Sequence, residues 1–289
     1  MYNLKIQPVK STQALLVSEG SERSLIISDL HIGWEISLIQ EGFHFPTQMN
    51  KILERIFKLL DAYKPSRLII LGDVKHTVSG IELEEWRDIP AFFESLLEKI
   101  KDITVVPGNH DGNISVLTPH SVRIAPVKGI TIGNEVGLFH GHSWPDPQLL
   151  GCTYLIMGHI HPVISIRDAA GFWIKRQVWV KVKCEGEKVA SSLFRHLNII
   201  SEVGDVKSFL LERFGVKLNL KYLIILPSFN EVLGGLPLNV RMRDDRETEA
   251  YIGPLLRSGS IDLQEADLYL LDGTFLGRIK DLQRLSKER

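Results

Sequence analysis

Carboxylates, imidazoles and one amide follow five short apolar runs of the chain, and these are residue types that bind divalent metal ions. The clusters are Asp29-Leu30-His31, Gly72-Asp73, Gly108-Asn109-His110-Asp111, His140-Gly141-His142 and Gly158-His159-Ile160-His161. Carboxylate oxygens suit hard divalent cations, and imidazole nitrogens extend the choice to Mn, Fe, Co, Ni or Zn. Two such ions held close together can share a hydroxide and hold a phosphate for in-line attack. The clusters therefore predict a two-metal site for phosphoester hydrolysis.

The five apolar runs are expected to be buried strands that bring these clusters to one edge of a sheet. They cover residues 25–28, 68–71, 103–106, 138–139 and 155–157. In open α/β folds, ligands bind at the carboxyl ends of the strands. Seven of the ten histidines, at positions 31, 76, 110, 140, 142, 159 and 161, lie in or beside the clusters. A single loop histidine is more often a surface or packed residue, but this concentration favours a site.

Helices are expected between the first strands. Residues 47–64 have apolar side chains at helical spacing, with Thr47 as the N-cap and Lys64-Pro65 as the end. A second amphipathic stretch covers 90–101 and places Pro90 in the first turn.

The pattern changes after residue 122 to short β runs, which Gly129, Gly133 and Gly137 are expected to separate. Strands are expected at 163–166 and 172–182, followed by a weakly helical stretch over 190–214. Because these strands need no helix between them, the pattern favours two facing sheets with outer helices over a doubly wound sheet.

Composition sets broad bounds on function. The chain has 289 residues, of which 44% are hydrophobic and 24% charged, as in ordinary globular proteins. Its formal net charge of −1 excludes a global positive field, although a local basic groove stays open. Cys152 and Cys184 are the only cysteines and are expected to be buried thiols. No leader or membrane-length apolar run is evident, so a cytoplasmic protein without membrane contact is expected.

The ordered motifs Asp-x-His, Gly-Asp, Gly-Asn-His-Asp, His-Gly-His and Gly-His-x-His resemble the calcineurin-like metallophosphoesterase superfamily. The resemblance implies an α/β fold, a four-layer αββα sandwich of two mixed sheets. It implies one domain over 1–289, with a possible helical insertion at about 195–220. By the same resemblance, one ion is bound by Asp29, His31 and His161, Asp73 bridges, and the other ion is bound by Asn109, His140 and His159.

The resemblance also assigns catalytic candidates. His110 would contact the phosphate and protonate the leaving group, a role that needs an imidazole within reach of the leaving oxygen. His76 would support the site or contact phosphate, or it is simply solvent-exposed. Asp111 would orient His110 or cap a turn.

Two further details are similar to the Mre11/SbcD-related branch. Phosphoprotein phosphatases of the superfamily have an Asp-Arg pair after Gly-Asp, whereas this chain has His76 three residues after Asp73. The late segment Leu226-Pro227-Ser228-Phe229-Asn230, with Gly234-Gly235, resembles the small archaeal form and the bacterial protein associated with a DNA ligase and helicase.

The leading hypothesis is a phosphodiesterase with two divalent ions, Mn²⁺ first among Fe, Ni, Co and Zn, acting on DNA or another nucleotide diester. The alternatives are a small-molecule phosphatase or cyclic-nucleotide phosphodiesterase, and a non-catalytic binding scaffold. Trp34 and Trp144 follow metal motifs and would either stack on a base or pack over the site.

Overall fold

The computed structural model describes residues 4–40, 42, 46–168, 170–199, 205–240 and 252–287. It divides into two compact units. Unit 1 consists of Met1–Val9, Gln13–Val127 and Ser228–Leu233, and unit 2 consists of Lys10–Thr12, Lys128–Pro227 and Gly234–Arg289. Each unit contains one β-sheet with its helices.

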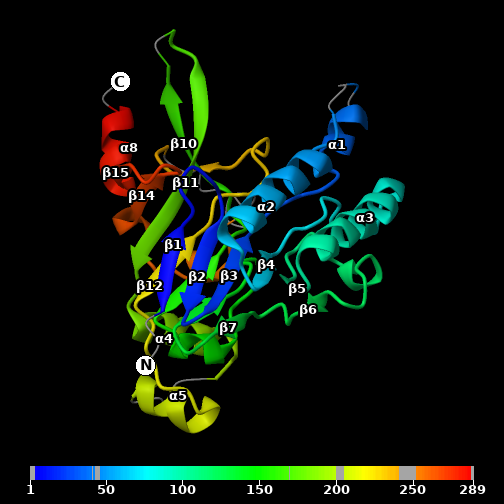
Figure 1. Ribbon diagram of the computed structural model, residues 1–289. Helices are drawn as coiled ribbons and strands as arrows, with labels where there is room; N and C mark the ends of the chain where they lie inside the picture. Colours follow the sequence, from blue (N-terminus) through cyan, green and yellow to red (C-terminus); the bar gives the residue numbers. More distant parts are fainter. Residues whose placement is uncertain are drawn as a thin grey trace. The chain divides into compact units, whose positions relative to one another are not determined.

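Unit 1 is built on a six-stranded mixed sheet in the order β1-β2-β3-β4-β5-β6 (Figure 1). The first two pairings are antiparallel and the last three are parallel. Its elements are β1 (Lys5–Pro8), β2 (Leu15–Glu19), β3 (Glu22–Ile27), α1 (Trp34–Gln40), α2 (Met49–Tyr63), β4 (Arg67–Leu71), α3 (Leu83–Lys99), β5 (Asp102–Val106), the 3₁₀ turn η1 (Ile114–Val116) and β6 (Arg123–Ile124).

Helices α2 and α3 cover the sheet of unit 1 because alternate residues of β3, β4 and β5 point toward them. Leu25, Ile70 and Val105 from the strands share one buried cluster with Ile56 of α2 and Phe92 of α3. The parallel order β3-β4-β5 places three polar strand ends at the same edge, as the sequence predicts.

Both helix starts differ from the prediction. The N-cap of α2 is Gln48 rather than Thr47, so the helix begins at Met49. Helix α3 begins at Leu83, where Glu82 and Glu85 form a capping box, and Pro90 lies inside the helix rather than in its first turn. The apolar pattern missed this start because four of the six residues 83–88 are charged.

Unit 2 is built on a nine-stranded mixed sheet with the path β13-β10-β11-β12-β9-β8-β7. Strand β14 also pairs with β11 and with β15. The strands are β7 (Ile130–Ile132), β8 (Val136–Leu138), β9 (Tyr154–Met157), β10 (Pro162–Arg167), β11 (Trp173–Lys183), β12 (Tyr222–Ile225), β13 (Leu236–Pro237), β14 (Asp267–Leu270) and β15 (Phe275–Arg278). The helices are η2 (Pro147–Gly151), α4 (Gly186–His196), α5 (Val206–Phe214), α7 (Gly253–Arg257), η3 (Leu263–Glu265) and α8 (Ile279–Lys287).

A second buried cluster joins this sheet to α4. It includes Leu155 and Val180 from the strands and Leu193 from the helix. Gly137 lies inside β8 and does not separate two strands, so that part of the prediction is wrong. Its missing side chain leaves room for the side chains of Leu149 and Leu155.

The predicted mixed α/β fold with two mixed sheets is confirmed. The extent of the single domain stays a prediction, as does the insertion, whose described part contains the end of α4 and all of α5. Residues 200–204 of that stretch lie outside the described residues. In the described part of the chain, no helix is long and apolar enough to cross a membrane.

Candidate metal centre

The loops after β3 and β4 run side by side, because backbone hydrogen bonds continue the pairing of the two strands. The amides of Asp29 and His31 donate to the carbonyls of Gly72 and Asp73 at 3.0 and 2.9 Å. The amide of His76 then donates to the carbonyl of Ile32 at 3.1 Å. The backbone therefore holds the first two motifs together without help from their side chains.

Within this pair of loops, Asp29, His31 and Asp73 each offer a ligand atom within 4.8 Å of the others. All three side chains are buried, at 0%, 3% and 2% exposure. Two carboxylates and an imidazole form a donor set that suits a divalent transition-metal ion. A cation would also offset the repulsion between two buried carboxylates. The residues of unit 1 thus fit the metal that the motifs imply.

Five of the seven predicted ligands have a left-handed backbone. Their φ angles are 57° at Asp29, 43° at His31, 52° at Asp73, 74° at His159 and 43° at His161. In the described part of the chain, only nine non-glycine residues have positive φ. Such a conformation costs on the order of 1–3 kcal/mol and is typical of functional sites. The strand ends turn sharply at these residues.

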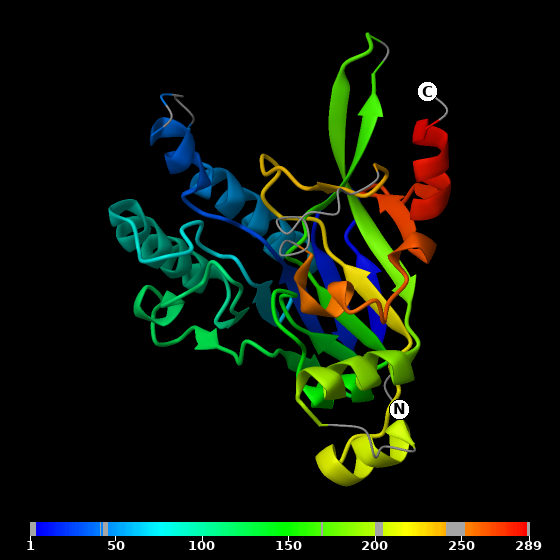
Figure 2. The same ribbon diagram turned by 180° about the vertical axis from the view of Figure 1, so that it is seen from behind.

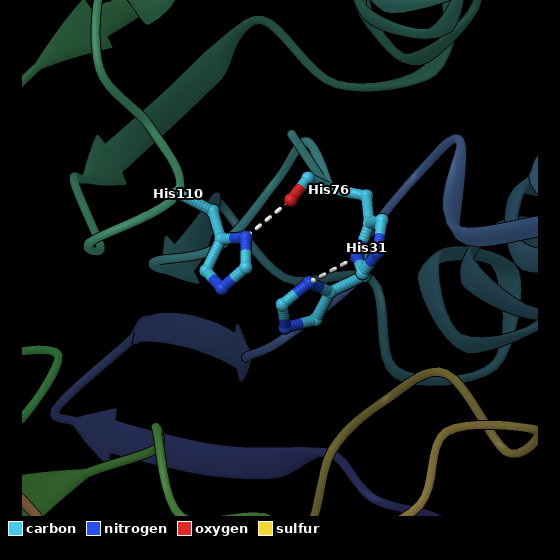
Figure 3. Close-up of side chains that lie close together, drawn as sticks. All are labelled: His31, His76 and His110. Carbon is cyan, nitrogen blue, oxygen red and sulfur yellow. Dashed lines mark hydrogen bonds between the residues drawn. The ribbon is translucent and has the colours of Figure 1, made fainter. Parts of the chain in front are cut away.

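Three histidines of unit 1 form a cluster beside the carboxylates (Figure 3). Nδ1 of His31 lies 3.2 Å from Nδ1 of His76, and Nε2 of His31 lies 3.4 Å from the Asp73 carboxylate. Nδ1 of His110 bonds the backbone carbonyl of His76, and its Nε2 lies 4.0 Å from the same carboxylate. Burial lowers the pKa of His76 and the neighbouring His110 lowers it further, against the opposing effect of nearby carboxylates.

Asp111 ties the loops after β4 and β5 together. One carboxylate oxygen accepts from the amide of Val74 at 2.8 Å, and the other accepts from the amide of Gly108 at 2.9 Å. Gly108 has to be glycine, because a Cβ there would lie 2.1 Å from the carboxylate of Asp73. Asn109 follows with an exposed side chain at the end of β5.

Unit 2 holds the remaining predicted ligands after β8 and β9. The ligand atoms of His140 and His159 lie within 4.8 Å of each other, and their ring centroids are 5.1 Å apart. The ring of His142 lies 5.3 Å from that of His140. His161 directly precedes β10 and is buried. Imidazoles gathered in this way match the nitrogen donors expected of a metal site.

The late sequence segment supports one predicted ligand loop in each unit. In unit 1, the amide of Phe229 donates to the carbonyl of Ser28 at 2.8 Å, and the buried Asn230 side chain donates to the carbonyl of Leu30 at 2.9 Å. In unit 2, a Cβ at Gly235 would lie 2.0 Å from the carbonyl oxygen of His161. The motif therefore has a structural function beside the metal-binding motifs.

Sequence reasoning missed Lys75 and Glu85, which form a buried ion pair beneath the His76 loop. Their side chains are 0% and 1% exposed, with Nζ and Oε2 3.8 Å apart. The ammonium group also donates to the carbonyls of Thr77 and, at 3.1 Å, Gly80. The only local sign in the sequence is that Glu85 comes three residues after Glu82, the spacing of a capping box, and this indicates a cap rather than an ion pair.

The two tryptophans near the motifs differ in their surroundings. Trp34 is the half-buried first residue of α1. Trp144 is buried in unit 2 and stacks on His196 with ring centroids 5.5 Å apart. For Trp144, the structure favours packing over base stacking.

Residues 23–149 match the family model of the calcineurin-like phosphoesterases. This part of the chain is a calcineurin-like phosphoesterase domain. The match agrees with the superfamily predicted from the motifs and supports a metal-dependent phosphoester hydrolase. A comparison with curated protein sequences found no match.

One of two similar solved structures supports the fold of this chain. The nuclease MPE of Pseudomonas putida is 18% identical, with a TM-score of 0.50 over 94% of this chain and all of the other. The phosphoesterase YfcE of E. coli is 19% identical, with a TM-score of 0.32 over 52% of this chain and 75% of the other. At such identity the first likeness shows the fold alone, and the second is too weak to add to it.

Proposed function

We propose that this phosphoesterase is a two-metal phosphodiesterase that acts on DNA or another nucleotide diester. The proposed ligands are those of the motif order: Asp29, His31 and His161 for one ion, Asp73 as the bridge, and Asn109, His140 and His159 for the other. Bound ions would supply a hydroxide nucleophile and offset the charge on the phosphate. The mixed oxygen and nitrogen donors suit Mn, Fe, Co, Ni or Zn, and Mn²⁺ is the metal that we propose first.

The observation that carries the proposal is the cluster of His31, His76 and His110 (Figure 3). Two of its rings, those of His31 and His110, also lie 3.4 and 4.0 Å from the Asp73 carboxylate. His31 turns Nε2 toward the carboxylate and Nδ1 toward His76. A ligating Nε2 carries no proton, so Nδ1 must carry it and donate to His76. The lowered pKa of His76 keeps that ring neutral and able to accept. We propose that His76 orients His31 rather than contacting phosphate.

His110 is the proposed proton donor to the leaving oxygen. Its Nδ1 is engaged with the carbonyl of His76, which leaves Nε2 as the nitrogen that faces the Asp73 carboxylate. In the doubly protonated ring, Nδ1 keeps its bond to that carbonyl and the second proton, at Nε2, is on the side that faces the Asp73 carboxylate, free to pass to a leaving oxygen. Asp111 acts indirectly, by holding the two loops that carry Asp73 and His110.

A diester rather than a monoester substrate is favoured by His76 in place of an Asp-Arg pair and by the late segment beside the metal-binding motifs. The Pseudomonas putida protein of similar fold is named as a nuclease, which agrees with this choice.

The test compares hydrolysis of bis-p-nitrophenyl phosphate and p-nitrophenyl phosphate with Mn²⁺ and the other metals. Diester turnover that is lost in Asp73→Asn supports the proposal. Asn retains an acceptor for the amide of His110, which Asp73 bonds at 2.9 Å. Turnover of the monoester alone would demote the chain to a small-molecule phosphatase. No turnover with any metal would favour the binding scaffold.

A further inference from the structure

The distal half of the β10–β11 hairpin lies outside the hydrophobic core of unit 2. The two strands pair from Val163↔Gln177 to Arg167↔Trp173, and both views show the hairpin extending past the other strands of its sheet (Figure 1, Figure 2). Asp168 closes the turn, because its carboxylate accepts from the amides of Ala170 and Phe172, each at 2.9 Å. These two hydrogen bonds join the end of β10 to the start of β11.

Two aromatic rings are exposed at this tip. Phe172 is 71% and Trp173 is 62% exposed. The strand register places Trp173 opposite Arg167, and side chains two residues apart share a face, so Lys175 lies on the same face as the indole. The guanidinium carbon of Arg167 lies 4.9 Å from the centroid of the indole ring. The indole thus has one cation over its ring and a second on the same face of the hairpin.

The hairpin is also locally basic. Residues 165–177 contain Arg167, Lys175 and Arg176 against Asp168 alone, which gives three positive charges and one negative, a net +2. The whole chain has a net charge of −1. An aromatic platform flanked by cations is the arrangement by which proteins bind unpaired bases and the adjoining phosphates.

We infer that the hairpin tip binds single-stranded nucleic acid, with an unpaired base stacked on Trp173 and phosphates beside Arg167 and Lys175. The inference rests on the proposed function, whose nucleotide diester substrate it narrows to a polymer with unpaired bases. Phe172 offers a second stacking surface beside the first. The near-neutral chain then needs no positive stripe over its whole surface, because the phosphates meet cations at the hairpin.

The test measures the binding of fluorescein-labelled oligo(dT) by fluorescence anisotropy. EDTA is present to prevent cleavage. A base–aromatic stack accounts for about 5- to 150-fold in affinity, so Trp173→Ala should weaken binding by about tenfold or more. Trp173→Phe should retain most of the affinity. An abasic strand should bind the wild-type protein more weakly than oligo(dT) by the same factor. The Trp173→Ala variant should bind the abasic strand and oligo(dT) equally. The double variant Arg167→Gln/Lys175→Gln should reduce the salt slope by about 0.7 for each lost phosphate contact.

The matched control is Leu211→Ala, an exposed apolar side chain on α5 of the same unit, which should bind like wild type. Equal binding by wild type and Trp173→Ala would overturn the inference, as would equal binding of the intact and abasic strands. A Trp173-dependent affinity for anionic lipid vesicles without one for oligo(dT) would overturn it in favour of a membrane. The variants should hydrolyse bis-p-nitrophenyl phosphate like wild type. Diester turnover without DNA binding would refute only the hairpin inference, and Trp173-dependent DNA binding without turnover would refute only the proposed function.

Discussion

Replacing Lys75 by methionine should destabilise the protein strongly, because it leaves the carboxylate of Glu85 buried without its cation. The two charged atoms lie 3.8 Å apart and both side chains are almost completely buried. At an effective dielectric constant of about 20, their attraction is about 4 kcal/mol. Glu85 would keep its hydrogen bonds from the amides of Thr77 and Glu82, at 2.9 and 3.1 Å. We therefore expect a loss of about 3–4 kcal/mol in the free energy of unfolding.

Urea unfolding of Lys75→Met, Glu85→Gln and the double variant measures this directly. The double variant removes both charges. Its loss in the free energy of unfolding should therefore be smaller than the sum of the two single losses, by about 2 kcal/mol or more. The control is Arg67→Met, which breaks an ion pair with Asp102 whose side chains are 40% and 45% exposed. That exposed pair should contribute less than about 1 kcal/mol.

The reasoning would be refuted if Lys75→Met lost no more free energy of unfolding than Arg67→Met. It would also be refuted if the loss in the double variant equalled the sum of the losses in Lys75→Met and Glu85→Gln. A functional readout follows from the same contacts. The pair anchors the loop whose carbonyl at His76 accepts from His110. Diester turnover should therefore fall in Lys75→Met, and partly recover in the double variant, while Arg67→Met retains it.

Three further predictions concern positions near the site and one buried thiol. Asn230→Ala should lower the free energy of unfolding by about 1–3 kcal/mol, because it leaves the Leu30 carbonyl and the Val232 amide without these hydrogen bonds. Calorimetric titration should also show weaker Mn²⁺ binding; unchanged metal affinity would contradict a supporting role. Gly108→Ala should displace Asp73 and abolish Mn²⁺ binding, whereas Gly112→Ala, whose Cβ would lie 3.6 Å from the nearest atom, should bind normally. Burial raises the pKa of Cys152 to about 11, so the reactive thiolate is about 0.1% populated at pH 8, against about a quarter for an ordinary thiol. At pH 8, iodoacetamide should therefore alkylate Cys152 about 250-fold more slowly in the native protein than in urea. The native rate should rise about tenfold for each unit of pH up to about 11; a rate that levels off near pH 8.5 would show that the thiol is not buried as described.

The strands could be predicted from the sequence because a short apolar run that ends in a polar cluster is typical of a buried strand reaching the edge of a sheet. The five runs correspond to β3, β4, β5, β8 and β9. The helix starts could not, because charged residues fill most of the first turns of α3, and because the N-cap of α2 is Gln48 rather than the Thr47 that capping preferences indicate. Pro90 is tolerated inside α3, although it lacks the amide proton of a normal helix position.

Part of the candidate site could also be predicted, and the rest depends on tertiary contacts. Motif order indicated which side chains gather at the strand ends, and their roles as ligands stay predictions. The pairing of Lys75 with Glu85 was not evident, since a lysine in a loop is usually exposed. Likewise, the position of Asp111 in the chain suggested two local roles, whereas its carboxylate joins two loops. Contacts of this kind join residues far apart in the chain, and no local pattern reports them.

The late segment explains how left-handed ligand residues are held in place before any metal binds. Asp29 and His161 both have positive φ, and such strain persists only where neighbouring structure fixes the backbone. In unit 1 the fixing contacts come from Phe229 and Asn230, and in unit 2 the close neighbour is Gly235. One short run of chain thus braces a strained loop in each unit. Its Asn and Gly are therefore required by the geometry of the ligand loops, although neither is expected to touch metal or substrate.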